Sequence, residues 1–265
     1  MTASDLDRSP VPMPRAASLG VGILLRAASF VLLLAIWEIA ARSAGSKTLP
    51  TIEAVAAALL DELARGELLH HLAVTLGRVF AAFTLAMAFG SALGLAMARW
   101  RAFDLVLDGW VVLLLNLPAL VIAVLAYVWF GLTEAAAIGA VVINKLPLVA
   151  MTMREGGRSL ARELAEMARA FRLSRWRRFR HVTTPQLLPF FLVSARSGLS
   201  LIWKIVLVVE LLGRSDGVGF KLQLYFQLFD VPHILAYALA FAAIVQLIEW
   251  GLLQPLERRA GAWRR

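Results

Sequence analysis

The chain has 265 residues, of which 60% are hydrophobic and 17% charged, with a mean hydropathy of +0.74. This composition excludes an ordinary water-soluble domain and is typical of a protein that crosses a membrane several times. The absence of cysteine excludes disulfides and Cys-ligated metal sites. The net charge of +9 is compatible with binding to nucleic acid or to a negatively charged membrane surface, so the positions of the basic residues decide its meaning.

Six long apolar runs predict an all-α, polytopic membrane protein with six transmembrane helices. They divide the chain into a cytoplasmic N-terminal segment (residues 1–22), a transmembrane domain (residues 23–256) and a basic cytoplasmic tail (residues 257–265). Alternatively, the first run is a signal peptide, because Arg26 precedes a short apolar stretch that ends in small residues. The predicted spans are residues 23–42, 79–98, 109–131, 135–153, 189–212 and 231–254.

The basic residues lie mainly on one side of these spans. Eighteen Lys and Arg fall in the N-terminal segment, the second-to-third connection, the fourth-to-fifth connection and the tail, against four in the opposite connections. Short cytoplasmic loops are enriched in Lys and Arg, so we expect both termini to lie in the cytoplasm. This orientation explains the positive charge without nucleic acid.

The connection after the first span has a helical, two-faced pattern over residues 51–72, which predicts an amphipathic helix on the outer membrane surface. Gly66 is expected to end it. The helix either only covers the bundle or contacts an extracytoplasmic partner.

The fourth-to-fifth connection, residues 154–188, is too charged for a span and too regular for a flexible linker. Ser159 is placed to cap one helix with an apolar stripe, and Ser174 to cap a second, short helix over residues 175–182. Pro185 ends this second helix or bends the chain beyond it. A short helix with apolar residues at its tip fits a groove on another protein.

This loop resembles the motif of the permease subunits of bacterial ABC importers, which runs Glu-Ala-Ala, three residues, Gly, nine residues, Ile, one residue and Leu-Pro. Here the same register reads Glu166-Met167-Ala168, then Arg172, Val182 and Thr184-Pro185. Arg172 stands where the family has glycine, so the geometry of the turn stays open. Further likeness to the nitrate, sulfonate and taurine branch lies in the segments WFGLTEAAAIGAVV, WKIVLVVELLG, SDGVGF and LFDVPHILAYALAF.

The resemblance implies a type I ABC importer permease in the bacterial inner membrane, paired with a second permease copy. Two ATP-binding subunits and a periplasmic or lipoprotein substrate-binding protein are the implied partners. The chain lacks the G-x-x-x-x-G-K-[ST] phosphate loop, so we expect it to be no enzyme and to hold no cofactor, with ATP and Mg bound by the partner subunits. The implied solute is small and anionic: a sulfonate, taurine, nitrate or a carboxylate.

The resemblance also implies that the loop is a coupling helix seated in the ATPase. The residues assigned to it are Glu166, Ala168, Phe171, Arg172, Leu173 and Pro185. Alternatively, Glu166 only forms intrahelical pairs with neighbouring arginines.

Charged residues inside spans are costly and need an explanation. Lys145 and Lys204, with the neighbouring Asn144, are candidates for a cationic translocation path, and no metal site is expected. The alternative for Lys145 is a buried ion pair with an acidic residue of another span, for which the candidates are Glu38, Glu210 and Glu249. Lys204 and Glu210 do not share a helical face, so each is expected to pair with another helix.

Two other protein classes remain open: a membrane-embedded enzyme, such as a lipid-modifying transferase, and a membrane scaffold that moves no solute. An enzyme of that kind needs acidic or histidine side chains gathered at one membrane face, and the sequence places Glu38, Glu210 and Glu249 on separate spans.

Overall fold

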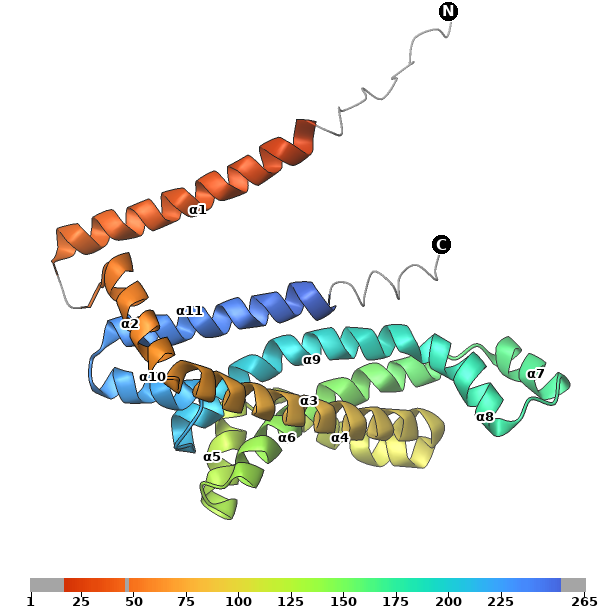
Figure 1. The fold of residues 1–265 in the computed structure, drawn as a ribbon. Coiled ribbons are helices and arrows are strands. Elements are labelled where there is room, and N and C mark those ends of the chain that lie inside the picture. Colours follow the sequence, from red (N-terminus) through yellow and green to blue (C-terminus); the bar gives the residue numbers. More distant parts are fainter. Residues whose placement is uncertain (1–16, 46–47, 254–265) are drawn as a thin grey trace, which may run out of the picture. The chain divides into compact units, whose positions relative to one another are not determined.

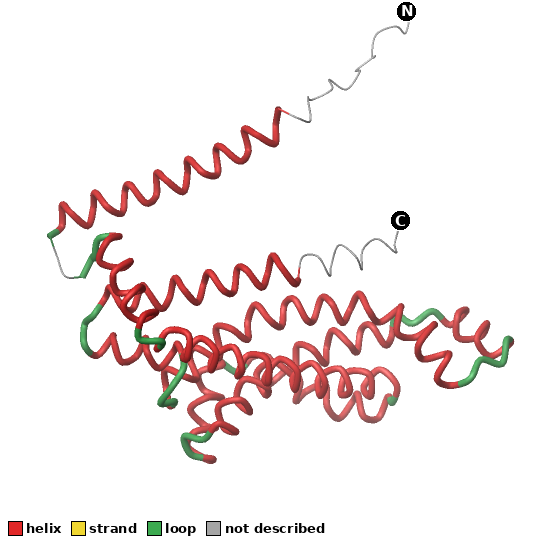
Figure 2. The backbone as a smooth tube through the Cα atoms, in the orientation of Figure 1, coloured by secondary structure: helices red, strands yellow, loops and turns green. Residues whose placement is uncertain are grey.

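The computed structural model describes residues 17–45 and 48–253, and this part of the chain contains helices and no strand (Figure 2). The start of the predicted N-terminal segment, residues 1–16, and the predicted basic tail, residues 257–265, lie outside the described residues. In chain order the elements are α1 (Ala17–Ala44), α2 (Ile52–Ala64), α3 (Glu67–Arg99), α4 (Arg101–Asn116), α5 (Ala119–Phe130), α6 (Glu134–Arg158), α7 (Arg162–Ala170), α8 (Arg175–Arg178), the π-helical turn η1 (Phe179–Thr183), α9 (Thr184–Gly213), α10 (Val218–Gln227), α11 (Val231–Ile248) and the π-helical turn η2 (Glu249–Leu253) (Figure 1).

The chain divides into two units, Met1–Ala56 and Ala57–Arg265, and α2 runs across the division. In the first unit, α1 is one apolar helix of 28 residues. Its acidic residue, Glu38, pairs with Arg42 at 2.6 Å and accepts a hydrogen bond from the backbone N–H of Ile52 at 2.9 Å. Glu38 therefore satisfies an unpaired N–H at the start of α2.

Within the described residues, five helical segments are long and apolar enough to cross a membrane, and a sixth crossing is available if α4 and α5 count as one span. These two helices meet at an angle of 101°, so the region of the third predicted span, residues 109–131, is sharply bent. Pro118 explains the break, because proline has no N–H to donate and forces the preceding residue, Leu117, into an extended conformation (ψ 128°).

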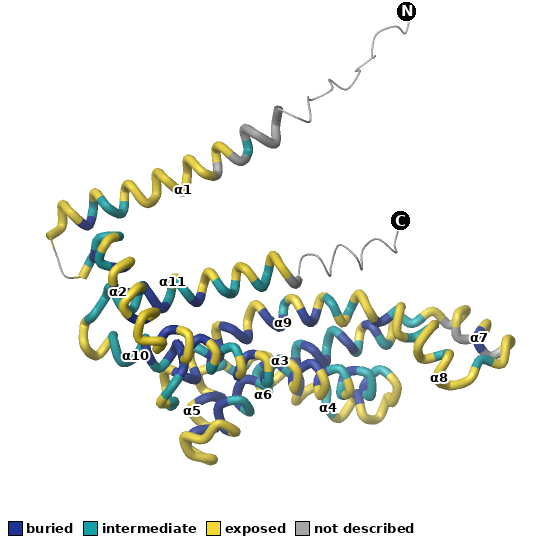
Figure 3. Tube along the Cα trace, in the orientation of Figure 1, coloured by how far each residue is buried: buried dark blue, intermediate teal, exposed yellow. Residues whose placement is uncertain are grey.

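The core of the second unit consists of α3, α6 and α9, whose facing sides are buried while their outer sides are exposed (Figure 3). Close packing between α3 and α6 requires glycine. A Cβ atom on Gly94 would lie 2.2 Å from the carbonyl oxygen of Ala150, and one on Gly90 would lie 2.7 Å from Cβ of Val149. The exposed sides carry large apolar residues such as Phe80 and Phe89, as a lipid-facing surface does.

The predicted surface helix over residues 51–72 is two elements, α2 and the first turns of α3. Gly66 separates them with φ 77°, a conformation that glycine adopts without steric cost. Helix α3 therefore begins a dozen residues before the predicted second span, and α6 also continues past its predicted end to Arg158.

Candidate functional site

The connection between α6 and α9 projects from one end of the bundle, which we call the loop end; the opposite end carries α10 and the start of α3 (Figure 1). As predicted, the connection contains two helices, α7 and α8. The prediction that Ser159 caps the first of them is wrong, because Ser159 ends α6 and α7 begins at Arg162. Ser174 caps α8 by accepting a hydrogen bond from the N–H of Arg177. Helix α7 is tied to α9 because Gln186 accepts a hydrogen bond from the N–H of Ala161 at 2.9 Å. The loop is therefore built as a folded projection.

Helix α7 ends in a left-handed turn at Arg172, with φ 50°. The N–H of Leu173 donates to the carbonyl of Ala168 at 2.9 Å, which closes a six-residue C-terminal cap around this turn. The arginine thus adopts the conformation that glycine usually supplies at this motif position. A non-glycine residue in that conformation costs on the order of 1–2 kcal/mol.

The side chains of the loop separate into a buried and an exposed set. Ala168 is buried, whereas Phe171 is 74% exposed and Glu166 and Pro185 are also exposed. Trp176, exposed too, stacks on Phe179 of η1 with 6.1 Å between ring centroids. The exposed tip of the loop is therefore aromatic and bordered by charge.

An ion-pair network at the base of the loop was not predicted. Arg154 and Arg158, one turn apart on α6, pair with Asp104 and Asp108, one turn apart on α4. The Arg154 Nε to Asp104 Oδ1 distance is 2.7 Å. The sequence contains a hint of this contact, because both arginines lie on one face of their helix and both aspartates lie on one face of theirs.

A second network lies at the opposite end and centres on Arg78 of α3, which is 5% exposed. Its guanidinium pairs with Glu134 at the start of α6 (2.6 Å), with Glu210 near the end of α9 (2.8 Å) and with Asp216. Arg214 also pairs with Glu134 at 2.7 Å. Arg78 thereby fastens three segments that are distant in the sequence.

Glu210 is fully buried and its carboxylate is completely hydrogen-bonded. It accepts from Thr75 at 2.9 Å and from the N–H of Gly219 at 2.8 Å, in addition to Arg78. The expectation that Glu210 pairs with another helix is confirmed. The SDGVGF turn fits around this carboxylate, since a Cβ on Gly217, where φ is 102°, would lie 2.4 Å from Glu210.

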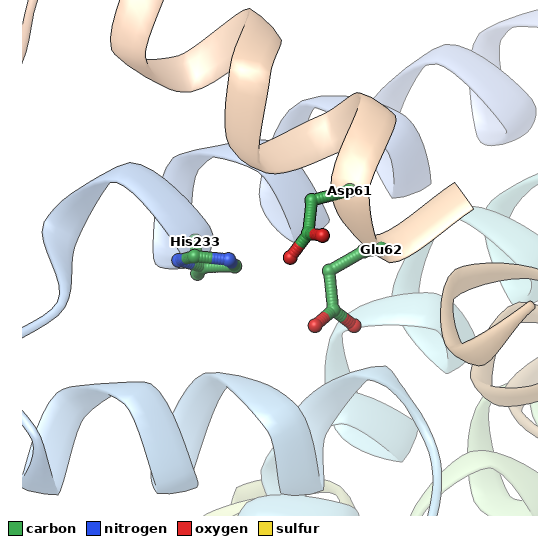
Figure 4. A group of neighbouring side chains, drawn as sticks. All are labelled: Asp61, Glu62 and His233. Carbon is green, nitrogen blue, oxygen red and sulfur yellow. The ribbon is translucent and has the colours of Figure 1, made fainter. Parts of the chain in front are cut away.

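Asp61 and Glu62 of α2 and His233 of α11 come close enough to suggest a metal site (Figure 4). Glu62 is already engaged, because it accepts hydrogen bonds from Tyr225 at 2.6 Å and from Tyr237, and Lys221 lies 3.6 Å away. Burial opposes the ionisation of Glu62, but these hydrogen bonds and the charge of Lys221 outweigh it and lower the pKa of its carboxyl below its usual range. We therefore interpret Asp61, Glu62 and His233 as a structural cluster, in which Lys221 already supplies the positive charge beside Glu62.

The candidate path residues lie in two different environments. Lys145 of α6 is 2% exposed and donates to the carbonyl of Ser197 on α9 at 3.2 Å, with no carboxylate partner among the described residues. Asn144 beside it is half-buried. Lys204 is exposed on α9 and forms no ion pair within the described part of the chain, unlike the expectation that it pairs with another helix.

Lys204 belongs to a polar stripe on the exposed side of α9, which we define as Arg196, Ser200 and Lys204, spaced by four residues. Arg196 also pairs with Glu249 at 3.6 Å. Beyond the stripe, Leu211 and Leu212 line an open groove of about 480 Å³ that is completed by Arg214, Gln223 and Gln227, among others. The polar stripe ends at Lys204, and the exposed apolar side chains of Val208, Leu211 and Leu212 lie between it and the opposite end of α9.

The family model of the binding-protein-dependent transport system inner membrane component matches residues 90–250, which include the loop, α9 and the glycine turn. The chain belongs to this family. It is therefore a multi-pass transport permease of the ABC importer class.

Its relatives are transport permeases and not enzymes. The chain is 32% identical to the putative aliphatic sulfonates transport permease protein SsuC of Escherichia coli (strain K12), over 74% of this chain and 77% of that protein. It is 29% identical to the taurine transport system permease protein TauC of the same organism (95% and 92% covered). The riboflavin transport system permease protein RibX of Chloroflexus aurantiacus (strain ATCC 29366 / DSM 635 / J-10-fl) is 31% identical (89% and 88% covered).

Two solved structures share the fold. One is an inward-facing conformation of the MetNI methionine ABC transporter, with a TM-score of 0.64, 18% identity, and 75% of this chain and 98% of that chain covered. The other is a crystal structure of an amino acid ABC transporter with histidines, with a TM-score of 0.60, 22% identity, and 76% and 98% covered. The predicted all-α, importer-permease fold is confirmed.

Proposed function

We propose that this chain forms half of the translocation path of an ABC importer for a small anionic solute. A second copy of the chain supplies the other half, two ATP-binding subunits supply the energy, and a substrate-binding protein delivers the solute. The proposal rests on the folded projection at the loop end. This projection contains the family motif and has exposed aromatic side chains at its tip.

The loop has the properties of a plug for a groove on another protein. Phe171 presents an exposed apolar side chain, and Glu166 presents an exposed charge near it. Ala168 is buried, so its small side chain lets α7 pack closely against the rest of the loop. The flanking helices are α6 and α9, so a displacement of the loop is passed to both. Because this chain has no phosphate-loop motif, ATP and Mg belong to the docked subunits.

The basic residues favour one orientation. Nine arginines between Arg154 and Arg180 lie at or next to the loop, which places the loop end in the cytoplasm by the positive-inside rule. The ATPases then dock from the cytoplasm, both termini are cytoplasmic, and α10 faces the external side of the inner membrane.

We place the solute path on the exposed side of α9. Lys204 lies nine residues before the end of α9, about 14 Å along the helix, which is close to half the thickness of a bilayer. A lysine that faces lipid at that depth costs roughly 2.5–3.5 kcal/mol. Lys204 is therefore more stable if it faces a water-filled path or a second subunit. Lys145 is assigned to hold α6 to α9 beneath this path, with Asn144 beside it.

The anionic solute is inferred from the charge of this surface together with the sulfonate and taurine permeases among the relatives. Sulfonates, taurine, nitrate and carboxylates share a negative oxygen cluster that a lysine ammonium binds. The riboflavin permease among the relatives shows that the family fold alone does not determine the solute. Lys204 is therefore the residue on which the proposed selectivity depends.

The experiment that tests the proposal is assembly with the ATPase. Glu166→Lys should leave the protein inserted in the membrane yet reduce co-purification of the ATP-binding subunit by about tenfold, since charge reversal at a docked surface is costly. Glu53→Lys, the same change at an exposed residue of α2 outside the loop, is the matched control. Unchanged co-purification with Glu166→Lys would contradict the assigned docking surface.

A further inference from the structure

The SDGVGF turn, which joins α9 to α10, is held by a row of hydrogen bonds from its backbone. The N–H of Gly217 donates to Nδ1 of His71 on α3 at 2.9 Å. The next two N–H groups along the turn donate to Thr75 of α3 and to Glu210 of α9, each at 2.8 Å. These groups lie at the N-terminus of α10, where a helix provides no acceptors of its own. The start of α10 is therefore fastened to α3 and α9 by side-chain acceptors.

The hydrogen bond from Gly217 determines which nitrogen of His71 carries a proton. Because Nδ1 accepts an N–H, the proton of the neutral ring lies on Nε2. Nε2 is 3.2 Å from Oε2 of Glu67 and donates to it. His71 is 5% exposed, so these two contacts and not water satisfy the ring. A second proton, added at Nδ1, would face the N–H of Gly217 and break that hydrogen bond.

Titratable and charged side chains surround this contact on each element packed against it. They are Glu67, His70 and Arg78 of α3, Glu62 of α2, Glu210 of α9, Asp216 of the turn, Lys221 of α10 and Tyr237 of α11. The acid in contact with the ring, Glu67, is also 3.0 Å from Lys221, which offsets its charge. Arg78 likewise pairs with Glu210 and Asp216. The carboxylates near the ring already have cationic partners, so a proton on His71 gains little from them.

The other histidines are arranged differently. His70 and His181 are exposed. Nδ1 of His233 lies 2.8 Å from Asp230, so a proton on that ring strengthens the contact. Within the described residues, His71 is thus the histidine whose protonation removes a hydrogen bond of the fold.

We infer that His71 is a pH-sensitive switch for the start of α10: the neutral ring holds the SDGVGF turn, and a proton taken up at Nδ1 from the external side releases it. The ordinary pKa of histidine is about 6.5, so the release belongs to mildly acidic conditions. The external location and the effect on transport rest on the proposed function, whereas the release of the turn does not.

Release of the turn would change the groove that α10 helps to line. Phe220, Gln223 and Gln227 of α10 border this groove of about 480 Å³. The Phe220 ring lies 6.0 Å from the His71 ring, so the groove wall and the switch are in contact. The groove keeps its shape while the turn is held, and we therefore expect import to decrease in acid.

The direction of the pH dependence follows from the form of the ring that the fold accepts. The held turn requires the neutral ring, whereas the released ring is free to take up a proton. The hydrogen bond is therefore present above about pH 6.5 and is lost as the pH falls below that value. One such proton raises the ratio of released to held turn by at most about thirtyfold between about pH 8 and about pH 5.

The test measures the mobility of the turn in the full-length protein in nanodiscs. The chain has no cysteine, so Ser215→Cys, at an exposed position of the turn, takes a single nitroxide label. The EPR spectrum should show a held label at about pH 8 and a mobile component that grows below about pH 6.5. With His71→Asn, which keeps an acceptor oxygen and does not titrate, the label should stay held down to about pH 5.

His70→Asn is the matched control, because it removes the neighbouring exposed histidine and should leave the release at the wild-type pH. A wild-type spectrum that does not change down to about pH 5 would overturn the inference. The same release in His71→Asn would overturn it too.

The consequence for transport is measured separately, as stimulation of ATP hydrolysis by a loaded binding protein in the permease–ATPase complex. Stimulation should fall severalfold more between about pH 8 and about pH 5 in wild type than in His71→Asn. Equal losses in the two proteins would overturn the link between the switch and transport. A complex that no binding protein stimulates at any pH would contradict the proposed function, while the label still decides whether His71 holds the turn.

Discussion

The two lysines within the apolar helices, Lys145 and Lys204, differ in burial and in hydrogen-bond partners, and these differences assign them different roles. Lys145 lies inside the bundle and donates to a carbonyl of α9, whereas Lys204 is exposed on α9 at mid-helix. The sequence predicted both as path candidates because charge and depth alone do not tell which way a side chain points. The packing of α6 against α9 makes the distinction.

If Lys204 lines the proposed path, Lys204→Met should raise the KM for an anionic solute by about tenfold, since the proposed anion-binding ammonium is lost. Lys204→Arg keeps the charge and should retain uptake. Uptake is measured with a radiolabelled sulfonate in proteoliposomes at low solute concentration. Normal uptake by Lys204→Met under those conditions would contradict the assigned path.

Asp216 makes the stability of the opposite end dependent on pH. Burial opposes its ionisation, but the hydrogen bond and charge of Arg78 outweigh burial and lower the pKa of the Asp216 carboxyl below its usual value. A folded-state pKa below the unfolded value of about 3.9 contributes stability above that value, and the contribution is lost as the pH falls through the folded pKa.

Asp216→Asn should therefore cost on the order of 1–2 kcal/mol at neutral pH, and its difference from wild type should shrink below about pH 4. Thermal unfolding of the protein in detergent, followed by tryptophan fluorescence from neutral pH to about pH 3, measures this difference. A difference that stays constant over the whole range would show that the Asp216 charge is not the cause.

Among the helices, the positions of α1, α3, α6, α9 and α11 could be predicted from the apolar runs, because each is one continuous stretch without a break. In the third span Pro118 indicates a bend between α4 and α5, but hydropathy does not give its size of 101°. The ion pairs of Arg78 were also missed. They join residues 56 to 138 positions apart, and no local spacing reports such a contact.

The contact between α3 and α6 depends on glycine and gives a prediction for these two helices. Gly94→Ala should destabilise the protein by about 1–3 kcal/mol, because the added Cβ would lie 2.2 Å from the backbone oxygen of Ala150 and force the helices apart. Gly77→Ala on the same helix meets nothing within 4 Å. It should be neutral or stabilising by about 0.5–1 kcal/mol, because alanine favours the helix.

Both variants are compared by thermal unfolding in the same detergent. If Gly94→Ala proves as stable as Gly77→Ala, the close approach of α3 to α6 is not a tight packing contact.

In the second unit as a whole, two charge networks fasten the helices at opposite ends of the bundle, and the loop between α6 and α9 extends from the end where α4 and α6 are joined. The sequence motif predicted the loop and the family, and both are confirmed by the fold and the relatives.

The measurement that tests the central claim most directly is ATP hydrolysis by the permease–ATPase complex in lipid, with candidate binding proteins offered together with sulfonates, taurine, nitrate and carboxylates. We predict that one loaded binding protein stimulates hydrolysis and that the stimulation is lost with Glu166→Lys. Hydrolysis that no loaded binding protein changes, in a complex that is stably assembled, would contradict the assignment of this chain as an importer for such anions.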